Sequence, residues 1–136
     1  MRARSSTSKR PEPLHSWLDL AAGDLLVAKR IVGDEELPPW AAAFHAQQAA
    51  EKALKGVLAA AEIAFERIHD LEALAARLPT PARDVFDLDD LARLTPWAVQ
   101  GRYGIEDVCF TRADVERLVE AAARVVASSR DVIRRF

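Results

Sequence analysis

The sequence predicts an all-α protein, an up-down helical bundle of about five helices, from three observations. Apolar residues recur every three or four positions over long segments, as they do on one face of an amphipathic helix. No segment has the alternating pattern of a half-buried strand bounded by turn residues. Half of the 136 residues are hydrophobic and 29% are charged, a composition typical of one folded domain of this length. We therefore expect residues 14–136 to form a single helical domain after a basic, disordered tail at residues 1–13.

Two long helices are expected in the N-terminal half. From Leu14 the apolar positions keep a helical spacing for several turns, and Gly33 is suited to end this helix in the left-handed conformation. Pro38 and Pro39 are suited to begin the next helix, because a residue of the first turn needs no N–H for the helical ladder. Residues 40–62 are rich in alanine, leucine, glutamine, glutamate and lysine, which are strong helix formers.

Shorter helices are expected in the middle of the chain. Asp70 can cap a helix that runs through Leu78, and Pro79 and Pro81 are expected to end it. The apolar spacing in residues 82–94 indicates one further short helix.

The C-terminal third is expected to contain a loop and a third long helix. Residues 95–104 include one proline and two glycines and therefore indicate a loop. Thr111, with Asp114 three positions later, has the spacing of a capping box. From Val115 to Ile133 the apolar residues form one stripe, as expected for an amphipathic helix.

The charge is unevenly distributed along the chain. The first ten residues carry four basic and no acidic side chains, and the remainder carries 15 basic and 21 acidic ones. An acidic domain is a poor general binder of nucleic acid, because non-specific affinity comes from lysine and arginine that neutralise phosphates. Any nucleotide or RNA site must therefore be local.

The sequence has no apolar run long enough to cross a bilayer and no secretory segment. We therefore expect a cytoplasmic protein without a membrane partner. Cys109 is the single cysteine, so an internal disulfide is excluded, and no structural metal is expected.

Polar residues interrupt the apolar face of the helix expected at residues 40–62. Gln47 lies near the centre of this face and Glu51 lies at its edge. Beyond the edge a polar strip continues at helical spacings: His45, Gln48, Lys52 and Lys55. Either these groups bond to neighbouring elements and form a solvated face, as buried and surface polar groups commonly do, or they form a ligand site.

Three segments occur in a distinctive order: FHAQQAAEKALK at residues 44–55, IHDL at 68–71 and RY at 102–103. In this order they resemble the HEPN domain family, a helical domain of higher eukaryotes and prokaryotes named for nucleotide binding, over residues 14–132. The resemblance implies a fold like a four-helix bundle, made of five helices and often dimeric. It also implies a minimal nucleotidyltransferase as partner, since small prokaryotic members often form toxin–antitoxin pairs with one. We therefore expect a homodimer with such a partner and no cofactor.

The resemblance also raises the question of ribonuclease activity. Some members of the family are metal-independent ribonucleases in which an arginine is followed, after four to six residues, by a histidine. Arg102 matches that arginine, but the corresponding positions hold Asp107, Val108 and Cys109. Cleavage by a ribose 2′-hydroxyl needs one group that takes a proton and another that gives one, which arginine does not readily do. We therefore expect a non-catalytic module; the alternative is a ribonuclease that uses Arg102, Asp107 and His69.

The expected ligand-binding residues are Arg102, Tyr103, Lys52, His45, Gln48 and Glu51. The Arg102 guanidinium could bind a phosphate and the Tyr103 ring a base; otherwise the arginine pairs with an acid and the ring packs on the bundle. Lys52 and His45 either meet the ligand or remain surface groups. Glu51 is expected to organise Lys55 or Arg102.

Two further interpretations stay open. His69 precedes the capping Asp70, where an imidazole often bonds to backbone groups. Tyr103 is a candidate for nucleotidylation, because in related toxin pairs a tyrosine near the arginine motif accepts the nucleotide.

A third reading of the whole chain is a structural dimer that only binds a protein partner through an apolar surface.

Overall fold

The computed structural model describes residues 13–65, 67–98 and 111–136. Within these ranges it contains six α-helices and one short 3-10 helix and no strand, so the predicted all-α class is confirmed. None of the helices in the described part of the chain has the length and apolar character needed to span a membrane.

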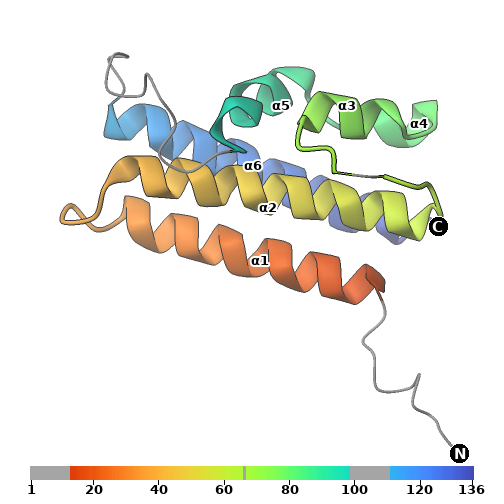
Figure 1. Ribbon diagram of the computed structural model, residues 1–136, viewed down its shortest axis with the longest axis horizontal. Coiled ribbons are helices and arrows are strands. Elements are labelled where there is room, and N and C mark those ends of the chain that lie inside the picture. Colours follow the sequence, from red (N-terminus) through yellow and green to blue (C-terminus); the bar gives the residue numbers. More distant parts are fainter. Residues whose placement is uncertain (1–12, 66, 99–110) are drawn as a thin grey trace, which may run out of the picture.

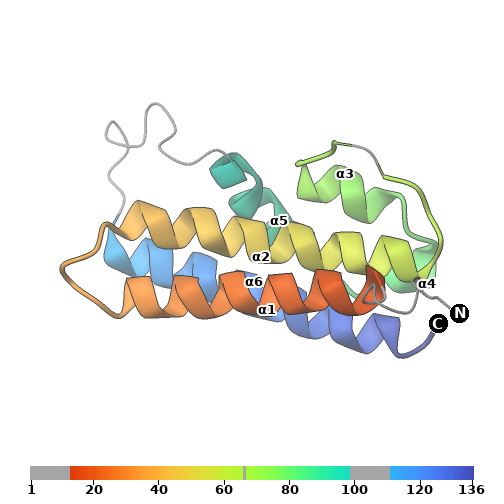
Figure 2. The same cartoon turned by 60° about the horizontal axis from the view of Figure 1, so that its bottom comes forward.

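Three long helices lie side by side and form most of the bundle: α1 (Pro13–Val32), α2 (Pro39–Ala60) and α6 (Arg112–Ile133) (Figure 1). The fourth position is filled by short helices: α3 (Leu71–Ala76), α4 (Thr80–Arg83), α5 (Leu88–Leu94) and the 3-10 helix η2 (Thr95–Ala98). Both views show α3 and α4 near the C-terminal end of α2 and α5 further back along it (Figure 2). Helices α1 and α2 therefore run in opposite directions, and α6 runs in the same direction as α2. The short helices α3, α4 and α5 together take the place of the third helix of an up-down bundle, as expected.

The central helix is α2, which contacts α1, α3, α5, η2 and α6. Its fully buried alanines explain how it can meet so many neighbours: Ala42, Ala43, Ala46, Ala49, Ala50 and Ala53. Alanine side chains are small enough to let adjacent helices approach closely, and alanine also has a high helix propensity. At Gly56 a methyl group would be crowded, because its Cβ would lie 3.1 Å from Cβ of Trp17 and α1 would have to shift by a few tenths of an ångström.

Larger side chains complete the core around α2. The stripe predicted on α6 is buried, with Val115, Leu118 and Val126 among its members, and Ile133 packs partly buried against it. The predicted cap of α3 is also confirmed, since the Asp70 side chain accepts a hydrogen bond from the backbone N–H of Ala73. The predicted capping box between Thr111 and Asp114 begins α6.

The prediction of a single helix at residues 82–94 was wrong. Helix α4 ends at Arg83, and α5 starts only at Leu88. Asp87 lies between them in an extended conformation, and its carboxylate accepts a hydrogen bond from the backbone N–H of Asp89. An aspartate that caps the following helix competes with continuation of the preceding one, and this splits the segment.

Two boundaries also differ from the expectation. Residues 95–98 form the 3-10 helix η2, where the sequence indicated a loop. Gly33 does not adopt the left-handed conformation expected of it; the chain leaves α1 through a turn in which the N–H of Asp34 bonds to the carbonyl of Ile31.

The left-handed cap occurs at the end of α2 and is made by Glu62, with φ of 60°. The N–H of Ile63 bonds to the carbonyl of Leu58, and the N–H of Glu62 bonds to that of Ala59, which is the Schellman pattern. A side chain with a Cβ is strained in this conformation, whereas glycine is not.

We predict that Glu62→Gly stabilises the protein by about 1 kcal/mol, because glycine removes this strain. The free energy of unfolding from urea denaturation measures the effect. Glu62→Ala keeps the Cβ and should show no comparable gain; an equal gain in both variants would mean that the glutamate charge, not the backbone, is responsible.

Ser129 on α6 is fully buried, and its Oγ has no hydrogen-bond partner among the described residues. An unsatisfied buried hydroxyl loses its hydration without compensation. We predict that Ser129→Ala raises the free energy of unfolding by up to about 1 kcal/mol. Ser128→Ala, at a half-buried neighbour, should change it by less than about 0.5 kcal/mol.

Candidate functional site

A buried carboxylate organises one side of α2. Oε1 of Glu51 accepts a hydrogen bond from Nε2 of Gln47 (3.0 Å), and Oε2 accepts from Nζ of Lys55 (2.8 Å) and Nδ1 of His69 (3.0 Å). We call these four residues the Glu51 cluster. Gln47, Glu51 and Lys55 are only 0%, 5% and 8% exposed. The predicted burial of Gln47 and the predicted pairing of Glu51 with Lys55 are therefore confirmed.

Lys55 is not part of a solvated face, where one interpretation of the polar strip placed it. Its Nζ lies 5.9 Å from the ring centroid of Trp17 and 5.8 Å from that of Phe65. These two rings meet edge to face with centroids 5.7 Å apart. The lysine is buried because α1 and the connection after α2 cover it with aromatic rings, whose faces attract a cation.

A second carboxylate, Asp24 on α1, holds the other two basic residues of the strip. Its Oδ1 lies 2.9 Å from Nδ1 of His45, and its Oδ2 accepts a hydrogen bond from Nζ of Lys52 at 2.6 Å. These three residues form the Asp24 cluster, which joins α1 to α2. Sequence reasoning missed Asp24, although its position three residues after Ala21 and four before Ala28 places it on the α1 face that is buried against the bundle.

Gln48 connects the strip to the Glu51 cluster, since its Nε2 donates to Oε1 of Gln47 at 2.8 Å. Every candidate residue on α2 therefore bonds to another side chain of the protein. A phosphate that approached Lys52 would have to compete with the Asp24 carboxylate that already neutralises it.

His69 has a different exposure from the rest of its cluster. Its side chain is 62% exposed, while its Nδ1 bonds to the buried Glu51. Because an ionised carboxylate only accepts hydrogen bonds, Nδ1 carries the proton in this contact and Nε2 faces away from it. A carboxylate that orients an imidazole in this way is an arrangement suited to proton transfer. Among the described residues the imidazole makes no bond to a backbone group of the kind that one interpretation expected; instead the His69 carbonyl accepts from Nε2 of Gln47 at 3.3 Å.

The pKa of Glu51 lies below its ordinary value. Burial by itself would raise the pKa, but the hydrogen bonds from Lys55, Gln47 and His69 outweigh it. The carboxylate is therefore held in its ionised form inside the bundle.

Arg102, Tyr103 and Asp107 lie outside the described residues, so the structure does not place them relative to these clusters. Trp97, the one tryptophan expected in a loop, lies in η2 and packs partly buried against the core. The described residues contain no group of three or more histidine, cysteine, aspartate or glutamate side chains that could hold a metal ion.

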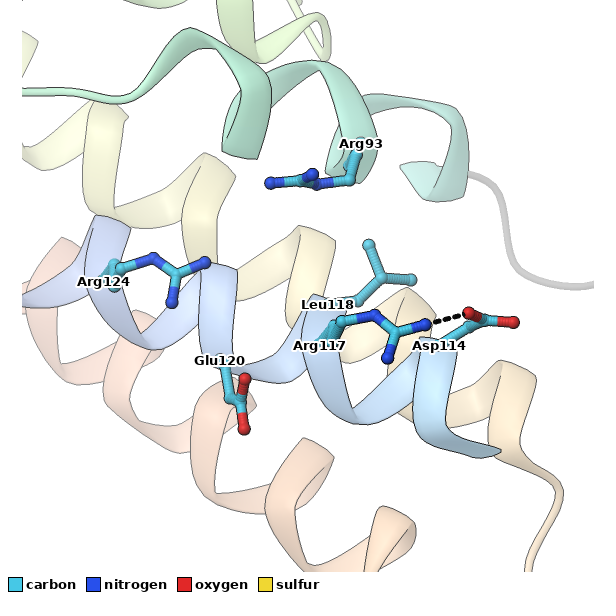
Figure 3. Close-up of a pocket in the computed structure, with 6 residues that line it drawn as sticks. All are labelled: Arg93, Asp114, Arg117, Leu118, Glu120 and Arg124. Carbon is cyan, nitrogen blue, oxygen red and sulfur yellow. Dashed lines mark hydrogen bonds and ion pairs between the residues drawn. The ribbon is translucent and has the colours of Figure 1, made fainter. Parts of the chain in front are cut away.

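Sequence reasoning also missed a pocket of about 260 Å³ between α5 and α6 (Figure 3). Its lining residues are Arg93, Asp114, Arg117, Leu118, Glu120 and Arg124. The signal in the sequence was the spacing of seven between Arg117 and Arg124, which places both on one side of α6, but their proximity to Arg93 depends on how α5 docks.

The comparisons with known proteins agree with this architecture. The sequence model of the HEPN domain matches residues 14–132. The chain belongs to the HEPN domain family. The crystal structure of TT1696 from Thermus thermophilus is similar to this HEPN domain with a TM-score of 0.74 and 26% identity, over 90% of this chain and 99% of that one.

A second structure, that of ST0689, described as an archaeal HEPN homologue, has a TM-score of 0.66 and 23% identity. It covers 90% of this chain and 99% of its own, and at this identity it supports the fold alone. No curated protein matches the sequence significantly.

We predict that Glu51→Gln destabilises the HEPN domain by about 3 kcal/mol at neutral pH, because it leaves the buried Lys55 ammonium without a counter-ion. Urea denaturation of Glu51→Gln, Lys55→Met and the double variant gives the coupling between the two residues. Asp131→Asn, which removes an exposed pair with Arg134, is the matched control and should cost less than about 0.5 kcal/mol. Equal losses in the two single variants and the control would contradict the structural role of Glu51.

The same pair predicts a dependence of stability on pH. A carboxyl whose pKa is lower in the folded state stabilises the protein above its unfolded pKa, and this contribution is lost as the pH falls through the folded value. Unfolding free energy should therefore decrease as the pH is lowered below the ordinary glutamate value of 4.5, and the slope should be smaller in Glu51→Gln. Identical slopes in the two proteins would exclude Glu51 as a contributor.

Proposed function

We propose that this HEPN domain is a non-catalytic module that binds a phosphate-bearing ligand, a nucleotide or an RNA phosphate, and acts with a minimal nucleotidyltransferase, as in a toxin–antitoxin pair. The family to which the chain belongs binds nucleotides or RNA. The observation that carries the proposal is the absence of a histidine at positions 107–109, which follow Arg102 after four to six residues, in a chain that matches the family along residues 14–132. The motif keeps its phosphate-binding cation and lacks its proton-transfer partner.

The ligand would meet Arg102 and Tyr103, a guanidinium and an aromatic ring in adjacent positions. On α2, the partly exposed Lys52 and His45 would add donors at the edge of the Asp24 cluster. Glu51 would act indirectly, by fixing Lys55 and His69.

A protein partner or a second copy would need an apolar surface. Helix α1 offers one, because Leu20, Leu26 and Val27 are 40–51% exposed on it. Gly23, between Leu20 and Val27, has nothing within 4 Å of the position of a Cβ, so the surface is open there. This supports the expected homodimer or the nucleotidyltransferase contact.

We predict that the purified protein binds nucleotides or labelled RNA without cleaving RNA, and that Arg102→Ala weakens binding by about tenfold or more. Binding and cleavage are scored in the same samples in the presence of a chelator, and circular dichroism checks the fold. Arg130→Ala, an exposed arginine near the end of α6, is the control and should bind normally. Unchanged binding by Arg102→Ala would move the function to the protein partner.

The second candidate function is a metal-independent ribonuclease, which the His69–Glu51 pair favours. In that case Arg102 would stabilise the phosphate, Asp107 would take the 2′-hydroxyl proton and His69 would protonate the leaving oxygen. RNA cleavage by the wild type, abolished in both Arg102→Ala and His69→Gln, would establish it against the non-catalytic module. Cleavage that persists in Arg102→Ala would indicate a contaminating nuclease.

A further inference from the structure

The pocket between α5 and α6 gathers three guanidinium groups from two helices. Arg93 comes from α5, and Arg117 and Arg124 come from α6, with Leu118 between them (Figure 3). All three arginine side chains are more than half exposed, so a ligand can reach them from solvent. We call this site the arginine pocket.

Two of the three guanidiniums are fixed from below by one buried carboxylate. Asp90 on α5 is 1% exposed, and it accepts from Nε (2.9 Å) and Nη2 (3.0 Å) of Arg124 and from Nη2 of Arg93 (3.2 Å). These contacts hold both side chains in place before any ligand arrives, which lowers the entropic cost of binding.

Most donors of the pocket remain available. Arg93 uses only Nη2 on Asp90, Arg124 uses Nε and Nη2, and Arg117 uses only Nη2, on Asp114. The other guanidinium nitrogens of these three residues have no partner in the described parts of the chain. The unused N–H groups of each arginine lie in the fixed plane of its guanidinium.

Three carboxylates lie around the pocket: Asp90 and Asp114 bond to its arginines, and Glu120 is one of its lining residues. Asp90 is occupied by its two arginines. Oδ2 of Asp114 accepts from the N–H and the hydroxyl of Thr111 in the capping box, at the positive end of the α6 dipole. In Figure 3 the Glu120 side chain extends from the side of α6 opposite to Arg93.

We propose that the arginine pocket binds a phosphate monoester, such as that of a mononucleotide or of an RNA 5′ end. Such a group carries a charge of about −1.5 to −2 and three strong acceptor oxygens, which match donors from three guanidiniums better than the two oxygens of a carboxylate do. The volume of about 260 Å³ suits a small group, and Leu118 gives it an apolar wall.

This site goes beyond the proposed function, because it contains none of the residues on which that function depends. The Glu51 and Asp24 clusters lie on α1, α2 and the connection to α3, whereas the arginine pocket lies on α5 and α6.

The test compares the full-length wild type with Arg93→Gln/Arg117→Gln. These substitutions leave the bidentate Arg124–Asp90 pair intact, whereas Arg124→Gln would deprive a buried carboxylate of its main partner and could unfold α5. Titration calorimetry with AMP at a fixed ionic strength should give a dissociation constant about tenfold or more higher in the double variant. Adenosine, which lacks the phosphate, should not bind to the pocket.

The matched control is Arg130→Gln/Arg134→Gln, which removes the same charge from the other end of α6. Arg134 pairs with Asp131 at the i,i+3 spacing, as Arg117 does with Asp114, so the local chemistry is alike. The control should change AMP binding less than about twofold. Equal weakening in both double variants, or failure of the wild type to bind either AMP or a 5′-phosphorylated RNA oligonucleotide, would overturn the proposal.

RNA oligonucleotides with and without a 5′-phosphate separate the two sources of the monoester. Pocket-dependent binding of the 5′-phosphorylated form alone assigns the site to RNA ends, and AMP binding without either oligonucleotide assigns it to free nucleotides. Equal, pocket-dependent binding of both oligonucleotides would overturn the monoester. Binding by Arg102→Ala is measured in the same experiments. If Arg102→Ala loses binding while Arg93→Gln/Arg117→Gln binds normally, this proposal is contradicted and the proposed function is supported.

Discussion

The structure depends on the ionised carboxylate of Glu51, which is buried in a helix whose other buried residues are mostly alanine and leucine or valine. Glu51 can lie in the core only if its charge is fully paired, since an isolated buried carboxylate is too costly. Its three donors come from one turn before it, one turn after it and the segment that leads into α3. To bring His69 to Glu51, the chain must fold back against α2, and this places Asp70 where it caps α3. One buried charge thereby fixes where the fourth layer of the bundle begins.

The contact between α1 and α2 combines close packing with a polar lock. Alanine faces and Gly56 allow the two helices to approach closely, but small side chains define the register weakly. The bonds of Asp24 to His45 and Lys52 are formed only when α1 and α2 are correctly aligned. We infer that the alanines let α1 and α2 pack closely and that the Asp24 cluster fixes how the two helices align along their axes. Buried polar residues have the same role in coiled coils.

The features that the sequence predicts well are local ones. Helical spacing locates α1, α2 and α6, and the aspartate and threonine caps locate the starts of α3 and α6, because these signals act within a few residues. The angle of Gln47 on its helix predicts its burial for the same reason. The burial of Lys55, the pairing of Asp24 and the arginine pocket depend on which helices become neighbours, and one sequence does not contain that information. The break between α4 and α5 at Asp87 is also a local feature. The sequence does not reveal it, because the apolar residues on both sides of Asp87 keep one continuous helical spacing.

The two polar regions of the molecule differ in how much hydrogen-bonding capacity they keep. On α2 each basic side chain lies within 3.0 Å of a carboxylate, which weakens its attraction for an incoming anion. In the arginine pocket Asp90 and Asp114 bond to the arginines but leave several guanidinium N–H groups unused, because each arginine has five donors. The family string at residues 44–55 therefore contributes mainly internally paired polar groups, with the partly exposed Lys52 and His45 as additional donors. Phosphate recognition is better suited to the C-terminal part of the chain, where Arg102 belongs to the segment that joins η2 to the helix carrying Arg117 and Arg124.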